Sequence, residues 1–478
     1  MNLDICLKAI EKAQGLGADY ADVRVGEVET KTITVRDGNV STAQNILTGG
    51  FGIRTLVNGA WGFSGSINMD SIDESVEKAV KIAHATALVR RSKVELAEVN
   101  PVVDSYRTPL QRDPFKVDDG EIIDTLTQAE ATAHGISEHI RTATATYRAY
   151  RDKKLLVTSM GAQIDQEMKW CGGILECTAV RSGESQPRRY PDRRGRYCTT
   201  GYEHFEELDL PGHAEQVGRE AVALLDAERL PETKTNAVIR HDQMVIQIHE
   251  SVGHPTELDR ALGTEADFAG TSFLTTDMLG TGYRFGSDIV NLVADPTEPK
   301  GLGTFAYDDD GVKAHKSYLV KNGEFVNYLS SRETAAELEL QSTGCARSVY
   351  PYDFPIVRMT NVNLEPGDWK WEEIVEDTSE GVLLQYNKSH SIDDRRLNFQ
   401  FGVETAYQIK NGSIEGLYKN VVYTGLTPEF WGSCNAISKD DWRMDGTTAC
   451  GKAVPGQGIY VGHGVGSARF KNVRMWSA

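Results

Sequence analysis

Six residues, His249-Glu250-Ser251-Val252-Gly253-His254, place two imidazoles around a carboxylate at the end of an apolar run. In zinc hydrolases with an HExxH motif, the histidines bind the metal and the glutamate handles the proton of the attacking water. Those histidines are four residues apart, about 40° around a helix, whereas a spacing of five corresponds to about 140°. A π-type bulge with about 4.4 residues per turn would bring both rings to one side, and such bulges occur mostly at functional sites. Because Gly253 lets a helix deform at low steric cost, we predict a distorted helix carrying an HExxxH motif. The alternative is a surface helix with two unrelated histidines.

A catalytic zinc site needs a third protein ligand beside an open position. By residue type, that ligand is one of Glu257, Asp259, Cys345, Cys450 and His463. Cys450 has the best local chemistry, because Lys452 would favour the thiolate that a metal needs. The alternative for any single cysteine is a small buried apolar side chain.

Six further segments stand in a fixed order along the chain. They are GADYADVR (17–24), GGFGIR (49–54), FAYDDDGV (305–312), PIVRMTN (355–361), CGK (450–452) and PGQ (455–457). With the HExxxH motif, they make the chain resemble the TldD/PmbA family of metallopeptidases over almost its whole length. The resemblance implies that His249, His254 and Cys450 bind Zn²⁺ and that Glu250 is the general base. The PmbA (TldE) type lacks the zinc motif, so this chain is similar to the TldD type.

The resemblance also implies a function and a partner. We expect a zinc-dependent metallopeptidase that hydrolyses peptide bonds of unfolded or leader-like peptides, as a homodimer or as a heterodimer with a PmbA/TldE-like subunit. Arg347, Arg358 and His463 are candidate donors to the oxyanion that forms during hydrolysis. Two other classes stay open: a non-hydrolytic modulator subunit with a structural zinc, and an amidohydrolase that acts on a modified natural product.

Composition narrows the range of partners. The net charge of −18 disfavours general binding to nucleic acid or to an anionic membrane. Seven scattered cysteines form no CxxC pair, and the chain has no signal-peptide core at its start and no apolar run long enough to span a membrane. We therefore expect a cytoplasmic protein with reduced thiols. One basic cluster is an exception, and we expect a solvated or internally paired loop there rather than a binding patch: Arg188, Arg189, Arg193, Arg194 and Arg196.

The periodicity of apolar residues predicts an α+β protein with three parts. Residues 1–100 form an N-terminal α/β lobe of helix, antiparallel strands and helix, with hairpin turns at Asp37-Gly38 and Asn58-Gly59. A polar stretch at 100–114 predicts a linker, and 101–230 form a middle helix-plus-strand domain. Residues 231–478 form a β-rich catalytic metal domain with many turns. Within it, Asp308-Asp309-Asp310-Gly311 resembles a calcium loop, but Val312 stands where the next ligand should be, so we predict a simple turn.

Overall fold

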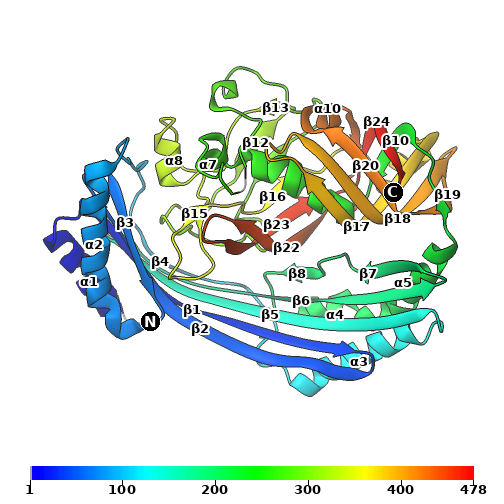
Figure 1. Ribbon diagram of the computed structural model, residues 1–478, viewed down its shortest axis with the longest axis horizontal. Helices are drawn as coiled ribbons and strands as arrows, with labels where there is room; N and C mark the ends of the chain where they lie inside the picture. Colours follow the sequence, from blue (N-terminus) through cyan, green and yellow to red (C-terminus); the bar gives the residue numbers. More distant parts are fainter. Residues whose placement is uncertain (1–2, 269) are drawn as a thin grey trace.

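The protein is an α+β chain, as predicted, and the structure builds it around two large sheets (Figure 1). The computed structural model describes residues 3–268 and 270–478. In Figure 1 the long strands of the first sheet curve beneath the C-terminal half of the chain.

Within the described residues, the first sheet has eight strands in the order β3-β2-β1-β5-β6-β4, with β7 and β8 also paired to β6. The strands are β1 (Tyr20–Arg36), β2 (Asn39–Val57), β3 (Ala60–Ser66), β4 (Val103–Arg107), β5 (Ile140–Thr158), β6 (Gln163–Arg181), β7 (Glu184–Tyr190) and β8 (Arg196–Cys198). The Asp37-Gly38 and Asn58-Gly59 turns are confirmed, and all four residues have positive φ, as type I′ hairpin turns require.

Two features of this sheet refine the predicted organisation. Strand β1 pairs with β2 on one side and with β5 on the other, so residue 100 falls inside the span of one continuous sheet. The predicted linker at 100–114 is wrong in part, because its residues Val103–Arg107 form strand β4, which pairs in parallel with β6. The N-terminal lobe and the middle region therefore share one framework.

Both faces of the first sheet are covered. Helices α1 (Leu3–Gly15) and α2 (Ile72–Val89) pack at one end, and α3 (Asp119–His134) and α5 (Leu210–Asp226) pack near the other (Figure 1). Two shorter helices complete this half: η1 (Met69–Ser71) and α4 (Glu203–Leu208). Alternation along β5 separates the faces, since Tyr147 packs in the core beneath α3 and α5, whereas Tyr150 packs with residues of the C-terminal half.

The second sheet, again eight-stranded within the described residues, runs β17-β10-β24-β20-β18-β19-β9, with β21 beside β24. The strands are β9 (Glu228–Arg229), β10 (Thr233–Ile239), β17 (Glu380–Ile392), β18 (Asn398–Lys410), β19 (Ser413–Lys419), β20 (Val421–Leu426), β21 (Cys434–Ile437) and β24 (Ala468–Ser477). Strand β9 joins this sheet just before residue 231.

Smaller elements fill the space between the two sheets. A four-stranded sheet holds β11 (Leu292–Ala294), β12 (Ser317–Lys321), β13 (Glu324–Phe325) and β16 (Val362–Leu364). Two strand pairs are β14 (Ala346–Arg347) with β15 (Ile356–Val357), and β22 (Arg443–Lys452) with β23 (Gln457–Val465). The helices are α6 (His241–Ile248), η2 (His249–Gly253), η3 (His254–Thr256), α7 (Leu258–Ala261), η4 (Thr276–Met278), α8 (Arg332–Ala336), α9 (Trp371–Glu376) and α10 (Thr427–Gly432).

All seven cysteines are buried free thiols. Across residues 3–268 and 270–478, every helix is too short or too polar to cross a membrane.

Candidate metal centre

The predicted distortion of the HExxxH helix is confirmed. Helix α6 passes into the π-helical turn η2, and the backbone N–H of His254 donates to the carbonyl of His249, five residues earlier. This wider turn brings the two imidazoles to one side, with ring centroids 4.9 Å apart at 87°. Both rings are buried, so the alternative of a surface helix with unrelated histidines is wrong.

Gly253 is required by packing rather than by backbone freedom. Its φ of −57° is an ordinary helical value. A Cβ atom at this position would lie 2.0 Å from the sulfur of Met359, which is far inside van der Waals contact. The glycine therefore lets Met359 pack directly against the π-helical turn.

Cys450 reaches the same point from strand β22. Its Sγ lies 3.8 Å from Nε2 of His254. The ligand atoms of His249, His254 and Cys450 all lie within 4.8 Å of one another, and all three side chains are buried. The structure thus brings together the three residues that the resemblance had implied.

Hydrogen bonds to the outer ring nitrogens aim both imidazoles at this point. His463 Nδ1 is 2.9 Å from the carbonyl oxygen of Val362, which can only accept, so Nδ1 carries a proton. Burial and the nearby His249 lower the pKa of His463 to about 3, so its ring is neutral and Nε2 is an acceptor. Nδ1 of His249, 2.9 Å away, must donate to it. His249 is left with an unprotonated Nε2 toward the cluster.

Glu257 orients the second imidazole, that of His254. His254 Nδ1–H donates to Glu257 Oε2 at 2.9 Å, and Arg260 Nε donates to the same oxygen at 2.8 Å. Nε2 of His254 is therefore the atom that faces Cys450. Carboxylate and histidine partners of this kind fix the orientation of metal-binding imidazoles.

The other third-ligand candidates have different roles. Glu257 and His463 orient the imidazoles, and Asp259 pairs with Lys452 at 2.7 Å. Cys345 lies outside the cluster, with its sulfur near Thr343.

The expected effect of Lys452 on Cys450 needs correction. Lys452 Nζ contacts Asp259 and the carbonyl of Val357, not the thiol. Burial raises the pKa of Cys450, but His254 and Arg358 outweigh it and lower the pKa to about 6. The thiolate is thus favoured by these two neighbours.

Glu250, the side chain between the histidines, is held by two residues that sequence reasoning missed. Arg396 Nη1 donates to Glu250 Oε2 at 3.1 Å, and His390 Nε2 lies 3.5 Å from Oε1. Burial raises the pKa of Glu250, but His254, His249, Arg396 and His390 together lower it. His390 is on β17 and Arg396 on the turn into β18, and no motif spacing links that hairpin to residue 250. Only the pairing of these strands reveals the contact.

Two of the candidate oxyanion donors are engaged elsewhere. Arg358 donates to the carbonyls of Gln457 and Cys450. Arg347 Nη1 donates to the carbonyl of Met359 at 2.5 Å. The third candidate, His463, accepts from His249, as described above.

The arginine cluster is mostly paired internally, as expected, but it is not all loop, since Arg188 and Arg189 lie in β7 and Arg196 in β8. Arg188 Nε is 2.6 Å from Glu220, Arg189 Nε is 2.6 Å from Glu176, and Arg196 Nε is 2.9 Å from Asp445. Nη1 of Arg194 is buried and has no hydrogen-bond partner.

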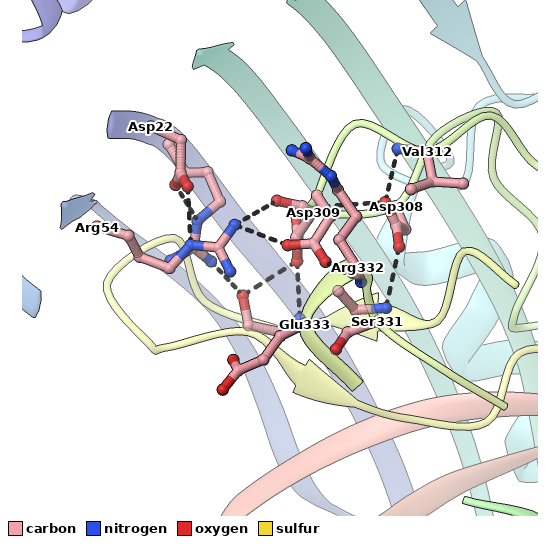
Figure 2. A network of polar contacts seen from close by, with 12 residues as sticks. Asp22, Arg54, Asp308, Asp309, Val312, Ser331, Arg332 and Glu333 are labelled. Atoms are coloured by element: carbon pink, nitrogen blue, oxygen red, sulfur yellow. Dashed lines mark hydrogen bonds and ion pairs between the residues drawn. The ribbon is translucent and has the colours of Figure 1, made fainter. Parts of the chain in front are cut away.

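The acidic turn at 308–310 joins the two halves of the protein. It is a turn, as predicted, but it is buried against the first sheet, and Figure 2 shows Asp22 and Arg54 facing it. Arg54 donates to Asp22 and to Asp310, each at 2.8 Å, and Lys154 donates to Asp309 at 2.9 Å. Segments 17–24, 49–54 and 305–312 of the resemblance therefore meet at this interface.

Fold and site together define an α+β protein with a buried candidate metal centre of two histidines and one cysteine, beside a held glutamate. A family model described as the PmbA/TldA metallopeptidase C-terminal domain matches residues 232–476, and one described as PmbA/TldA metallopeptidase domain 1 matches 21–83. The chain belongs to this PmbA/TldD metallopeptidase family.

Curated relatives extend the similarity over the whole chain. A metalloprotease of Methanocaldococcus jannaschii is 31% identical over 97% of this chain and 98% of its own. A protein of Saccharolobus solfataricus named zinc metalloprotease TldD homolog is 21% identical over 98% and 99% of the two chains.

Solved structures share the fold. TldE from Thermococcus kodakarensis has a TM-score of 0.77 at 16% identity, over 99% of this chain and 100% of that one. A Thermotoga maritima protein described as a modulator of a DNA gyrase also has a TM-score of 0.77 at 16% identity, over 99% of both chains.

Proposed function

We propose that the chain is a zinc-dependent metallopeptidase of the TldD type that hydrolyses peptide bonds in unfolded or leader-like peptides. The observation that carries the proposal is the buried convergence of His249, His254 and Cys450 next to Glu250. The metalloprotease names of relatives along the whole chain support the reaction class.

The residues fit zinc. Imidazole nitrogen and thiolate sulfur are ligands that zinc prefers, and three protein ligands leave one position open for chemistry. Both imidazoles are held by partners of the kind found around metal-binding histidines. One relative carries zinc in its name.

Zinc held by these residues would supply Lewis acidity toward the peptide carbonyl and the attacking water. Glu250 accepts a proton from that water and passes it to the nitrogen of the leaving amine. Arg396 and His390 act as positioning residues, since they hold the two carboxylate oxygens and keep Glu250 ionised. His463 and Glu257 keep the imidazoles in the tautomer that the metal needs.

The depth of the centre supports a flexible substrate. His249, Glu250, His254 and Cys450 are only 2%, 7%, 5% and 2% exposed. The surface of a folded protein cannot present a peptide bond to such a buried point, so we expect the substrate to be flexible. The similarity in fold to TldE supports assembly of this chain with a PmbA/TldE-like subunit or with a second copy.

Cleavage of an unstructured peptide by the zinc-loaded full chain tests the proposal. We expect Glu250→Gln to lower kcat by about 10²–10⁴, because a positioned general base contributes about that factor. Its zinc content should match that of the wild type. The matched control is Glu372→Gln on the exposed face of α9, which should leave kcat unchanged.

Two results would replace the proposal. If Glu250→Gln keeps full activity with bound zinc, the metal is structural and the chain is a modulator subunit. If only small amides are cleaved and peptides are not, the protein is an amidohydrolase that acts on a modified natural product.

A further inference from the structure

A pocket lies between the first sheet and the C-terminal half, and its lining does not include Glu250 or the three candidate zinc ligands. It is a small, partly open pocket with about 50 Å³ of interior space. Side chains of β5 and β6 line one side, and residues 302–309, 347–349 and 459–460 line the other. Ile459, in the lining, is the strand partner of Cys450, so the pocket adjoins the candidate metal centre, although none of His249, His254 and Cys450 lines it.

Three aromatic rings form one wall of the pocket. Tyr150 and Trp170 stack with centroids 5.1 Å apart at 15°. Tyr460 meets both rings edge-on, at 4.6 Å and 5.0 Å. The indole Nε1–H of Trp170 is buried and has no hydrogen-bond partner. The wall therefore offers apolar contact together with one unused donor.

Asp152, also in the lining, is a buried carboxylate with little compensation. It is 4% exposed, and its Oδ1 has no hydrogen-bond partner. Its nearest cation is Lys154 at 3.8 Å, which already donates to both oxygens of Asp309 and to the carbonyl of Ser348. Burial raises the pKa of Asp152 to about 6, and Lys154, shared with Asp309, offsets this only in part.

Arg347 supplies the opposite charge in the same lining. Its guanidinium donates to the carbonyl of Met359 and lies over the ring of Phe305, 5.3 Å from the centroid. Among the described residues, no carboxylate pairs with it, and in particular it makes no ion pair with Asp152. Burial and the neighbouring Arg358 lower the pKa of Arg347 to about 10. The pocket thus presents two opposite charges that form no ion pair with each other.

We propose that this pocket binds a zwitterion, either a free α-amino acid or a dipeptide with an apolar side chain. Asp152 accepts from the ammonium group, Arg347 donates to the carboxylate, and Tyr150, Trp170 and Tyr460 contact the side chain. A simple cation would face Arg347, a simple anion would face Asp152, and an apolar molecule would leave both charges buried without compensation. Only a ligand with both charges satisfies the lining.

Calorimetric titration of the full chain, with and without zinc, tests this site independently of the proposed peptidase activity. The probes are L-phenylalanine and L-leucyl-L-leucine, each also in its N-acetylated and its C-amidated form. We expect at least one free zwitterion to bind with Kd below about 1 mM, a modest affinity for a ligand of this size. Blocking either end should weaken its binding at least tenfold, in the presence and in the absence of zinc.

Variants assign each charge to a residue. In Asp152→Asn, the free and acetylated forms should bind alike, and in Arg347→Gln, the free and amidated forms should bind alike. Asp73→Asn and Arg219→Gln, at exposed positions on α2 and α5, are the matched controls and should bind as the wild type does. The proposal is overturned if neither zwitterion binds, if the blocked forms bind as well as the free ones, or if binding requires zinc. The blocked ligands test the wild type directly, so the test holds even if a variant fails to fold.

Discussion

The candidate metal centre and the acidic turn at 308–310 are both buried polar clusters, but they differ in how their charged and polar groups are paired. In the turn, the carboxylates of Asp309 and Asp310 accept hydrogen bonds from Lys154 and Arg54 of the first sheet, at 2.9 Å and 2.8 Å. In the metal centre, by contrast, the Nε2 atoms and the thiolate sulfur converge on one another. Burial of charged groups therefore does not by itself identify a functional site. The informative feature is a group of electron-pair donors held toward one point.

The two clusters also respond differently to loss of a member. A buried ion pair that loses one partner leaves an uncompensated charge, which is strongly destabilising. A ligand side chain that is removed from a metal site mainly lowers metal affinity. Substitutions in the acidic turn should therefore mainly lower the free energy of unfolding, and substitutions of the metal ligands should mainly lower metal affinity.

The largest expected effect is in the acidic turn. Arg54→Ala should lower the free energy of unfolding by about 3–5 kcal/mol, because Asp22 and Asp310 then lose their shared cation. Urea unfolding measures this change. Arg219→Ala, on the exposed face of α5, is the matched control and should change stability by less than about 0.5 kcal/mol. Equal effects of the two substitutions would contradict a structural role for the turn.

Zinc should stabilise the folded chain through the metal centre. At a free concentration of 100 times its Kd, it should add about 2.7 kcal/mol to the free energy of unfolding, since a ligand that binds only the folded state shifts the equilibrium by this amount. His249→Ala should lose most of that gain, and Arg54→Ala should keep it. Thermal or urea unfolding with and without zinc distinguishes these outcomes, and a gain that survives in His249→Ala would place the metal elsewhere.

The smallest of these effects concerns the orientation of His249. His463→Leu removes the acceptor of the His249 Nδ1–H bond, and loss of such a partner typically weakens metal binding about 10–100-fold. Competition with a fluorescent chelator measures the zinc affinity. The matched control is His315→Leu at an exposed position, which should leave the affinity unchanged. An unchanged affinity in His463→Leu would mean that other packing fixes the ring.

Local patterns were sufficient to predict the elements near the site. The spacing of His249 and His254 predicted a widened helical turn, and Asn58-Gly59 predicted its hairpin. The role of Gly253 could not be predicted, because it depends on Met359, more than a hundred residues later. The same limit applies to Arg396 and His390, which reach Glu250 only through the pairing of β17 with β18.

The acidic turn illustrates a second limit. Asp308-Asp309-Asp310-Gly311 identifies a turn through local geometry, but its burial depends on Arg54 and Lys154, which the fold supplies from the first sheet. Sequence alone gives the charges of a segment and not the partners that compensate them. For this reason, only the structure distinguishes the acidic turn, which has a structural role, from the candidate metal centre.

The zinc content of the full chain, measured for the wild type and for Cys450→Ser, tests the central claim most directly. Cys345→Ser, at a buried cysteine outside the cluster, is the control. We predict that the wild type and Cys345→Ser retain a stoichiometric zinc ion through dialysis and that Cys450→Ser loses it. Equal zinc content in all three proteins, or none in the wild type, would contradict a metal centre built from His249, His254 and Cys450.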